Sequence, residues 1–291
     1  RRRKRSRKAA LDALLEGPEV ARRASTLDPQ CMLAGLSPAA AAAVAEYCAA
    51  AFGESSGEVA TCLLAAAEAL PTGLRVKELL ESVEAYREVA AFAHDAGKSR
   101  PIDSIFDVAC GHGMLGLFLA YRFPQRKVLC VDRERRGVFG ALVSAFRRHG
   151  EAAPGEPEPL SNLSFLEAEA EALEVPERSM LVAVHACNEL NRQVIESARA
   201  AGAVWAVMPC CVRAGTYLPC RAGGTLADDD EAKHVLNCGV VAGIYRAERL
   251  QAIDRRITNR NILLCGGAGF GSYAEAQQRC AEGRGAPARE P

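Results

Sequence analysis

Apolar residues recur at helical spacing through the first third of the chain. In "RVKELLESVEAYREVAAFAHDAG" (75–97) they follow the three- and four-residue spacing of an amphipathic helix that ends at a glycine. Ser37 and Pro38 form a typical helix start before "AAAAAVAEYCAAAF" (39–52). The pattern predicts a helical N-terminal region over residues 11–99, in which no catalytic motif is evident.

From about residue 102 the pattern changes to short apolar runs that alternate with helical segments. The runs include "DSIFDVAC" (103–110), "KVLCVD" (127–132), "MLVAVHAC" (180–187) and "AVWAVMPCCV" (203–212). Strand–helix alternation of this kind predicts an α/β fold, a Rossmann-like parallel sheet with helices on both faces. Ligands bind such sheets at the carboxyl ends of the strands, so the loops after each strand are the places to look for a site.

The composition fits a soluble globular protein. Of the 291 residues, 49% are hydrophobic and 25% are charged. The longest apolar run, 203–212, is about half of the roughly 18 residues that a spanning helix needs, so we expect no membrane segment. The twelve cysteines are spread along a long chain, which favours a reducing intracellular compartment over a disulfide scaffold. Cytoplasm, nucleus and organelle stay open.

The net charge of zero arises by cancellation. Residues 1–8, "RRRKRSRK", hold seven basic groups, which leaves 29 basic and 36 acidic groups in the rest of the chain. We expect residues 1–10 to form a disordered basic tail that contacts nucleic acid or serves as a targeting address. Residues 276–291 are expected to form a second flexible tail.

A glycine-rich loop follows the first predicted strand. Gly111, Gly113 and Gly116 in "DVACGHGMLG" (107–116) satisfy G-x-G-x-x-G, and Asp132 ends the next strand where a ribose-binding acid belongs. A nicotinamide enzyme and a methyltransferase both fit that pattern. Asp107 inside the strand favours a cationic ligand such as S-adenosylmethionine, because a carboxylate there repels a pyrophosphate. Glu169 is placed to accept a hydrogen bond from an adenine amino group.

These motifs resemble those of the class I S-adenosylmethionine-dependent methyltransferases over roughly residues 100–266. "DVACGHGMLG" is similar to the family's first motif, "VLCVDRE" (128–134) to its second-strand acid motif and "FLEAEAEAL" (165–173) to its adenine-side motif. The resemblance implies a domain over residues 100–275 with a seven-stranded sheet whose last two strands form an antiparallel hairpin. It also implies the cofactor S-adenosyl-L-methionine, bound by Asp107, Ala109, Gly111, His112, Gly113, Asp132, Arg133, Glu169 and Ala170.

Polar and thiol side chains follow the fourth and fifth predicted strands, in "VHACNELN" (184–191) and "VMPCCVRAG" (207–215). The expected strand order makes these strands neighbours, so the side chains should converge beside the transferred methyl group. The catalytic candidates are His185, Cys187, Asn188 and Cys210.

Three uses of these residues are open. His185 can act as a general base, since its ordinary pKa lies near neutrality. Cys210 can act as a nucleophile, as in cytosine-C5 RNA methyltransferases. A zinc site from His185, Cys187, Cys210 and Cys211 is disfavoured because adjacent cysteines bind one metal awkwardly, and we predict no metal. Histidine and cysteine at buried strand ends are also common packing residues.

The leading hypothesis is an S-adenosylmethionine-dependent methyltransferase whose acceptor is RNA, with tRNA favoured. The His-x-Cys and Pro-Cys-Cys motifs are similar to a subgroup that includes a tRNA 2′-O-ribose methyltransferase branch, although Asn188, Asn191 and Arg192 replace that branch's residues after the His-x-Cys. The alternatives are a non-catalytic binding module for RNA or a protein partner, a methyltransferase for a small molecule or protein, and a nicotinamide oxidoreductase. No membrane partner is expected, and the sequence leaves the oligomeric state open.

Overall fold

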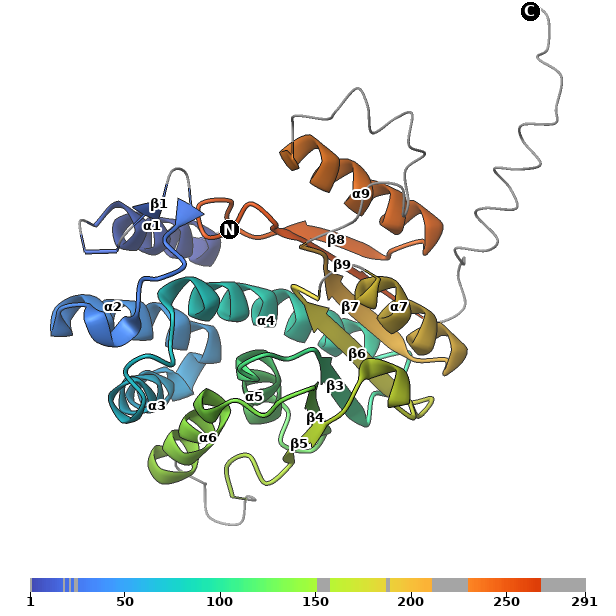
Figure 1. Cartoon of the computed structure of the whole chain (residues 1–291), viewed down its shortest axis with the longest axis horizontal. Coiled ribbons are helices and arrows are strands. Elements are labelled where there is room, and N and C mark those ends of the chain that lie inside the picture. Colours follow the sequence, from blue (N-terminus) through green and yellow to red (C-terminus); the bar gives the residue numbers. More distant parts are fainter. Residues whose placement is uncertain are drawn as a thin grey trace, which may run out of the picture.

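A computed structural model describes residues 2–17, 19–20, 22–23, 26–150, 158–186, 189–210 and 230–267. A seven-stranded sheet runs through the molecule in the order β5-β4-β3-β6-β7-β9-β8 (Figure 1). The strands are β3 (Ser104–Val108), β4 (Lys127–Asp132), β5 (Leu163–Glu167), β6 (Ser179–Val184), β7 (Val204–Met208), β8 (Arg249–Ala252) and β9 (Ile262–Gly266). β9 is antiparallel to both of its neighbours, β7 and β8, while the other six strands all run in the same direction. The predicted Rossmann-like sheet and its final antiparallel hairpin are therefore confirmed.

Helices precede the sheet and alternate with its strands. The N-terminal elements are α1 (Arg2–Glu16), α2 (Pro38–Ala49), α3 (Ser56–Ala69) and α4 (Val76–Ala96), with a two-stranded sheet of β1 (Arg22–Arg23) and β2 (Thr26–Leu27). The later helices are α5 (Met114–Arg122), α6 (Gly137–His149), α7 (Leu190–Ala200) and α9 (Asp230–Ile244). Short 3₁₀ turns are η1 (Leu33–Gly35), η2 (Ala50–Ser55) and η3 (Ala170–Ala172). The helical region ends at Ala96 and the sheet begins at Ser104, on either side of the boundary expected near residue 100.

The alternation of side chains along each strand divides the core in two. Ile105 belongs to a cluster with residues of α3, α4, α5 and α6, whereas Phe106 belongs to a cluster with residues of α7 and α9. Successive strand residues point to opposite faces, so neighbouring positions enter different cores. Figure 1 shows α4 and α5 on one side of the sheet and α7 and α9 on the other. The sequence pattern of short apolar runs follows from burial on both faces.

An aromatic cluster joins the N-terminal helices to the sheet. Phe118 of α5 contacts Tyr86 of α4 at a ring-centroid distance of 5.8 Å and Phe52 of η2 at 5.2 Å. Phe52 stacks on Tyr86 at 4.7 Å, and Phe146 of α6 lies 6.5 Å from Phe118. Phe118 and Phe146 are fully buried. The N-terminal helices and the sheet therefore share one hydrophobic core.

The beginning of the chain differs from the disordered tail that we predicted for residues 1–10, because Arg2–Glu16 form α1. Leu11 and Leu15 of this helix are buried one turn apart, and Asp12 accepts a hydrogen bond from Arg256 (2.6 Å). Arginine and lysine are good helix formers, so a helix anchored by two leucines can extend back into the basic run. The tail expected at residues 276–291 lies outside the described residues. None of the described helices is both long enough and apolar enough to span a bilayer.

Replacing Phe118 by alanine tests the shared core. We expect Phe118→Ala to lower the free energy of unfolding by about 3–5 kcal/mol, the usual loss for a buried phenylalanine. Urea unfolding should remain a single transition, because α4 and the sheet lose contacts together. Val235→Ala on α9, where the side chain is 51% exposed, is the control and should change stability by no more than about 0.5 kcal/mol. Two separate transitions in the wild-type protein would contradict a common core.

Candidate functional site

The backbone of the loop between β3 and α5 adopts left-handed conformations that glycine accommodates most easily. Gly111 and Gly113 have φ of 60° and 71°, in the left-handed region, and Ala109 reaches 54° although it carries a side chain. A Cβ on Gly113 would collide with the ring of Phe139, and one on Gly116 would collide with Sγ of Cys130. Backbone conformation therefore favours glycine at position 111, close packing favours it at position 116, and both favour it at position 113. Left-handed conformations at non-glycine residues are concentrated at functional sites, which draws attention to Ala109.

Asp132 at the end of β4 holds this loop in place. Its Oδ2 accepts a hydrogen bond from the backbone N–H of Gly111 (2.7 Å), and its Oδ1 accepts one from the N–H of Arg133 (2.8 Å). The parallel pairing of β3 with β4 brings the two strand ends together. The predicted ribose-binding acid thus lies beside the glycine loop, as the sequence spacing indicated.

Asp107 is buried below the same loop. Its side chain lies on the α5 face of the sheet, and its Oδ2 accepts a hydrogen bond from the backbone N–H of Gly116 (2.8 Å). Burial, together with the negative charge of Asp132, raises the pKa of Asp107 to about 7, and the Gly116 hydrogen bond opposes that rise. Asp107 therefore changes its charge close to neutral pH.

A cavity of about 410 Å³ opens at the carboxyl ends of β3, β4 and β6. Six of the predicted residues line it: Asp107, Ala109, Gly111, His112, Asp132 and His185. The remaining charged groups in its wall are Lys77, Glu78, Glu81 and Arg136, so four carboxylates face two permanent cations. An excess of acidic groups favours a ligand with positive charge.

His185 lies at the edge of this cavity directly after β6. Its backbone has a φ of 58°, and its N–H donates to the carbonyl of Met208 at the end of β7 (2.9 Å). Cys210 donates through Sγ to the carbonyl of His185 (3.2 Å), so the structure brings these two catalytic candidates together. Cys187 and Asn188 lie outside the described residues, as does Cys211. Within the described ranges no group of three or more acidic, histidine or cysteine side chains could hold a metal ion.

Helix α4 supplies residues that the sequence analysis did not assign to the site. Lys77, Glu78, Glu81 and Ser82 line the cavity opposite the glycine loop. Nε2 of His185 lies 3.2 Å from Oε1 of Glu81, whose side chain is only 6% exposed. The one signal in the sequence was the acidic residue Glu81, which occupies a buried position of an amphipathic helix. A buried charge of that kind requires a partner, but the sequence does not show which one.

The remaining predicted cofactor residues lie outside this cavity. Nε of Arg133 donates to Oε2 of Glu169 (2.8 Å) in an exposed ion pair, so Glu169 is engaged with an arginine on the surface. Ala170 lines a separate cavity of about 300 Å³ between η3 and α7. The adenine-side assignment of these residues stays a prediction.

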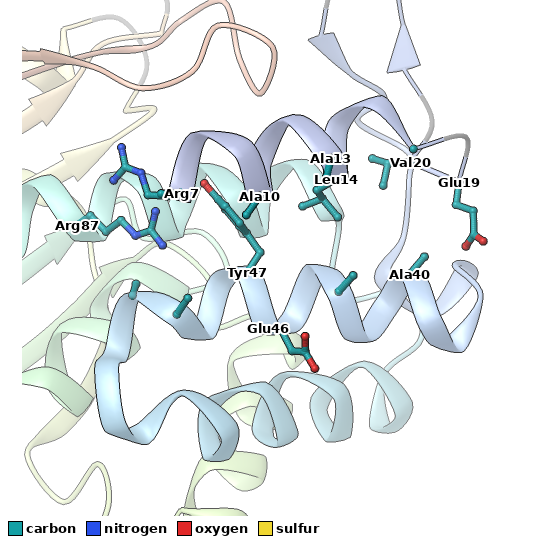
Figure 2. Close-up of a pocket in the computed structure, with 14 residues that line it drawn as sticks. Arg7, Ala10, Ala13, Leu14, Glu19, Val20, Ala40, Glu46, Tyr47 and Arg87 are labelled. Carbon is teal, nitrogen blue, oxygen red and sulfur yellow. The ribbon is translucent and has the colours of Figure 1, made fainter. Parts of the chain in front are cut away.

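A larger cavity of about 1040 Å³ lies between α1 and α2 (Figure 2). Its walls are mostly small apolar side chains such as Ala10, Ala13 and Ala40. Arg7, Tyr47 and Arg87 gather toward one end, but all three contact Glu84, at 3.8, 2.8 and 2.7 Å. Arg7, Tyr47 and Arg87 therefore have Glu84 as their partner within the protein and do not indicate a ligand site. The smaller cavity at the strand ends is the candidate reaction site.

Comparison with known proteins agrees with this geometry. A family model described as a methyltransferase domain matches residues 75–214. The match starts at the beginning of α4, well before the boundary that we predicted at residue 100. The observed seven-stranded sheet, whose last two strands β8 and β9 pair in an antiparallel hairpin, is the arrangement that the resemblance implied. The chain has the fold of a class I methyltransferase.

Individual similar proteins are distant in sequence. Over 113 residues the chain is 27% identical to a glutathione S-transferase C-terminal domain-containing protein of Xenopus laevis, a match that covers 39% of this chain and 17% of that protein. Similar solved structures include an O-methyltransferase family protein from Burkholderia thailandensis, with 14% identity, 77% and 62% of the two chains covered and a TM-score of 0.35. Another is a tRNA (uracil-54, C5)-methyltransferase from Pyrococcus abyssi in complex with S-adenosyl-L-homocysteine, with 14% identity, 64% and 37% coverage and a TM-score of 0.37.

The burial of Asp107 predicts a pH dependence of stability. An aspartate in an unfolded chain has a pKa near 3.9, so the folded protein takes up a proton at Asp107 between about pH 4 and pH 7. The stabilisation that protonation of Asp107 gives to the folded protein is fully present below pH 4 and is lost as the pH rises through about 7. Asp107→Asn should therefore gain stability relative to wild type as the pH rises from 5 to 8, with a constant difference above that. Urea unfolding at pH 5, 8 and 9 measures it.

Asp103→Asn is the matched control for this measurement, since Asp103 is exposed at the opposite end of the same strand and pairs with Arg178 (3.0 Å). A stability difference between Asp107→Asn and wild type that is the same at pH 5 and pH 8 would contradict the assignment.

Proposed function

We propose that the chain binds S-adenosyl-L-methionine and transfers its methyl group. The observation that carries the proposal is the acid-rich cavity at the strand ends, with a glycine loop on one side and Asp132 at its edge. The donor brings a positively charged sulfonium and an ammonium group, both of which the carboxylates of Glu78, Glu81 and Asp132 attract, and Asp107 adds to this attraction in its ionised form. Asp132 is placed to hold the ribose hydroxyls, and the glycines allow the backbone to approach the ligand.

The same charges disfavour a nicotinamide dinucleotide. A pyrophosphate carries negative charge and would face Glu78, Glu81, Asp107 and Asp132 in a cavity of limited size. Like charges at short distance in a partly buried site repel strongly. We therefore place the oxidoreductase hypothesis behind methyl transfer.

His185 is proposed as the general base that prepares the acceptor. The donor supplies a methyl group on a cationic sulfur, which is the leaving group. The acceptor's O–H or N–H gives its proton to the imidazole, its lone pair forms the new bond to carbon, and the old carbon–sulfur bond breaks with its electrons on sulfur. Cys210 lies next to His185 through its hydrogen bond to the His185 carbonyl, so it helps to shape the acceptor side. Alignment of the reacting atoms supplies most of the rate gain.

RNA, with tRNA first, is the acceptor that we propose. Arg133, Arg135 and Arg136 follow β4 at the rim of the site, and Arg136 lines the cavity itself. Arg133 pairs with Glu169, and Arg255, Arg256 and Arg260 are likewise engaged with Glu231, Asp254 and Asp230, so these arginines contribute less free charge than the composition indicated. A phosphate backbone is the polyanion that such rim arginines bind.

Calorimetric titration with S-adenosylhomocysteine tests donor binding. We expect saturable binding of this ligand and none of NAD. Asp132→Ala should weaken the binding about 5- to 150-fold, because an unpaired polar group in the pocket costs about 1–3 kcal/mol. Asp103→Ala, at the opposite edge of the sheet, should bind as wild type does. Binding of NAD alone would support the oxidoreductase, and unchanged affinity in Asp132→Ala would contradict the ribose assignment.

Transfer of a radioactive methyl group tests the acceptor. We expect label in unmodified tRNA and total RNA, and a loss of about 10²- to 10⁴-fold in His185→Ala with S-adenosylhomocysteine binding retained, since general-base catalysis contributes about that factor. Protein and small-molecule fractions are assayed beside RNA. Label in one of those fractions alone would reject the RNA proposal. Donor binding with no labelled fraction would instead favour the binding module.

A further inference from the structure

Contacts among Lys77, Glu81 and His185 bridge two distant parts of the chain at the cavity. Lys77 and Glu81 belong to α4, whereas His185 follows β6. Oε1 of Glu81 lies 2.6 Å from Nζ of Lys77 and 3.2 Å from Nε2 of His185. All three residues line the cavity of the proposed donor site. The N-terminal helical region therefore reaches the side chain that we propose as the general base.

The carboxylate of Glu81 is ionised in this setting. Burial opposes its ionisation, but hydrogen bonding and charge from His185 and Lys77 outweigh burial and hold the pKa of Glu81 below its usual value. Lys77 alone would neutralise a buried carboxylate at this position. Neutralisation therefore does not explain why Nε2 of His185 also lies close to the same oxygen.

Glu84 provides the contrast on the same helix. It is buried to a similar degree, but its contacts are Tyr47, Arg87 and Arg7, away from the cavity. Glu84 thus joins helices of the N-terminal region. Glu81 is the buried acid of α4 that faces the site.

We propose that Glu81 is a positioning residue for His185, accepting the Nε2–H so that Nδ1 is the nitrogen that takes the acceptor's proton. This inference rests on the proposed function of methyl transfer. An imidazole whose one N–H is held by a carboxylate is fixed in tautomer and ring orientation. The carboxylate also stabilises the imidazolium that forms when the acceptor's proton arrives. Because the backbone of His185 is held by Met208, the contact with Glu81 fixes the other end of the residue.

A double-mutant cycle separates this role from a merely structural one. Glu81→Ala should lower kcat about 10- to 100-fold, the range typical for loss of an outer partner of a functional histidine, with the affinity for S-adenosylhomocysteine retained. Glu81→Gln should lose less, because its amide oxygen still accepts a hydrogen bond. In a His185→Ala background, Glu81→Ala should cause no further loss, since the two residues act as one unit.

Asp95→Ala is the matched control. Asp95 is an acid of the same helix, but it pairs with Lys98 (2.9 Å) and Arg249 (2.9 Å) and does not line the cavity, so kcat should stay within about twofold. Full kcat in Glu81→Ala, or an equal fold-loss in the presence and absence of His185, would overturn the proposal.

The tautomer of His185 gives a readout that needs neither turnover nor a folded Glu81 variant. Long-range ¹H–¹⁵N spectra of the wild-type protein, assigned with His185→Asn, should show a proton on Nε2 and none on Nδ1 in the neutral ring. A proton on Nδ1 would overturn the proposal. If the wild type neither binds S-adenosylhomocysteine nor methylates any fraction, the proposed function fails whatever the tautomer. If it turns over and Glu81→Ala is silent, only the positioning role fails.

Discussion

The parallel pairing of β4, β3 and β6 is the constraint on which the site depends. Residues in register along these strands end at one edge of the sheet, so Asp132, the glycine loop and His185 meet there although they lie far apart in sequence. Hydrogen bonds across the strand ends, from Gly111 to Asp132 and from His185 to Met208, then set the loop conformations. The left-handed backbone of Ala109 and His185 is sustained by this framework and would be costly in a free loop.

The N-terminal helices take part in this framework and are more than a covering layer. The stacked rings of Phe52 and Tyr86 and the contact of Tyr86 with Phe118 fix α4 against α5. That packing places the first turns of α4 over the cavity, where Lys77 and Glu81 complete a wall that the sheet leaves open. The match to the methyltransferase family model begins at residue 75 and so includes α4 together with the sheet.

Local patterns in the sequence predicted the sheet and the glycine loop because both are determined over short distances. Alternating apolar runs define buried strands, and the spacing from Gly111 to Asp132 reflects one β-α-β unit. The role of α4 was missed because the partner of Glu81 lies more than a hundred residues away. The basic start of the chain was assigned to a tail because composition does not reveal that Leu11 and Leu15 find a core. The sequence pattern could not show that Arg133 and Glu169 form an ion pair with each other on the surface.

The distribution of charge links the fold to the chemistry. Burying Asp107 and Glu81 costs stability, and a fold selected for stability alone would fill these positions with apolar groups. Asp107 offsets that cost with the N–H of Gly116, and Glu81 offsets it with Lys77 and His185. Both acids face one cavity, so their cost is concentrated where a cationic ligand would recover it by binding. A donor of the proposed kind, with its positive charge, would therefore also stabilise the fold, and its affinity and the stability of the protein would both depend on the same buried carboxylates.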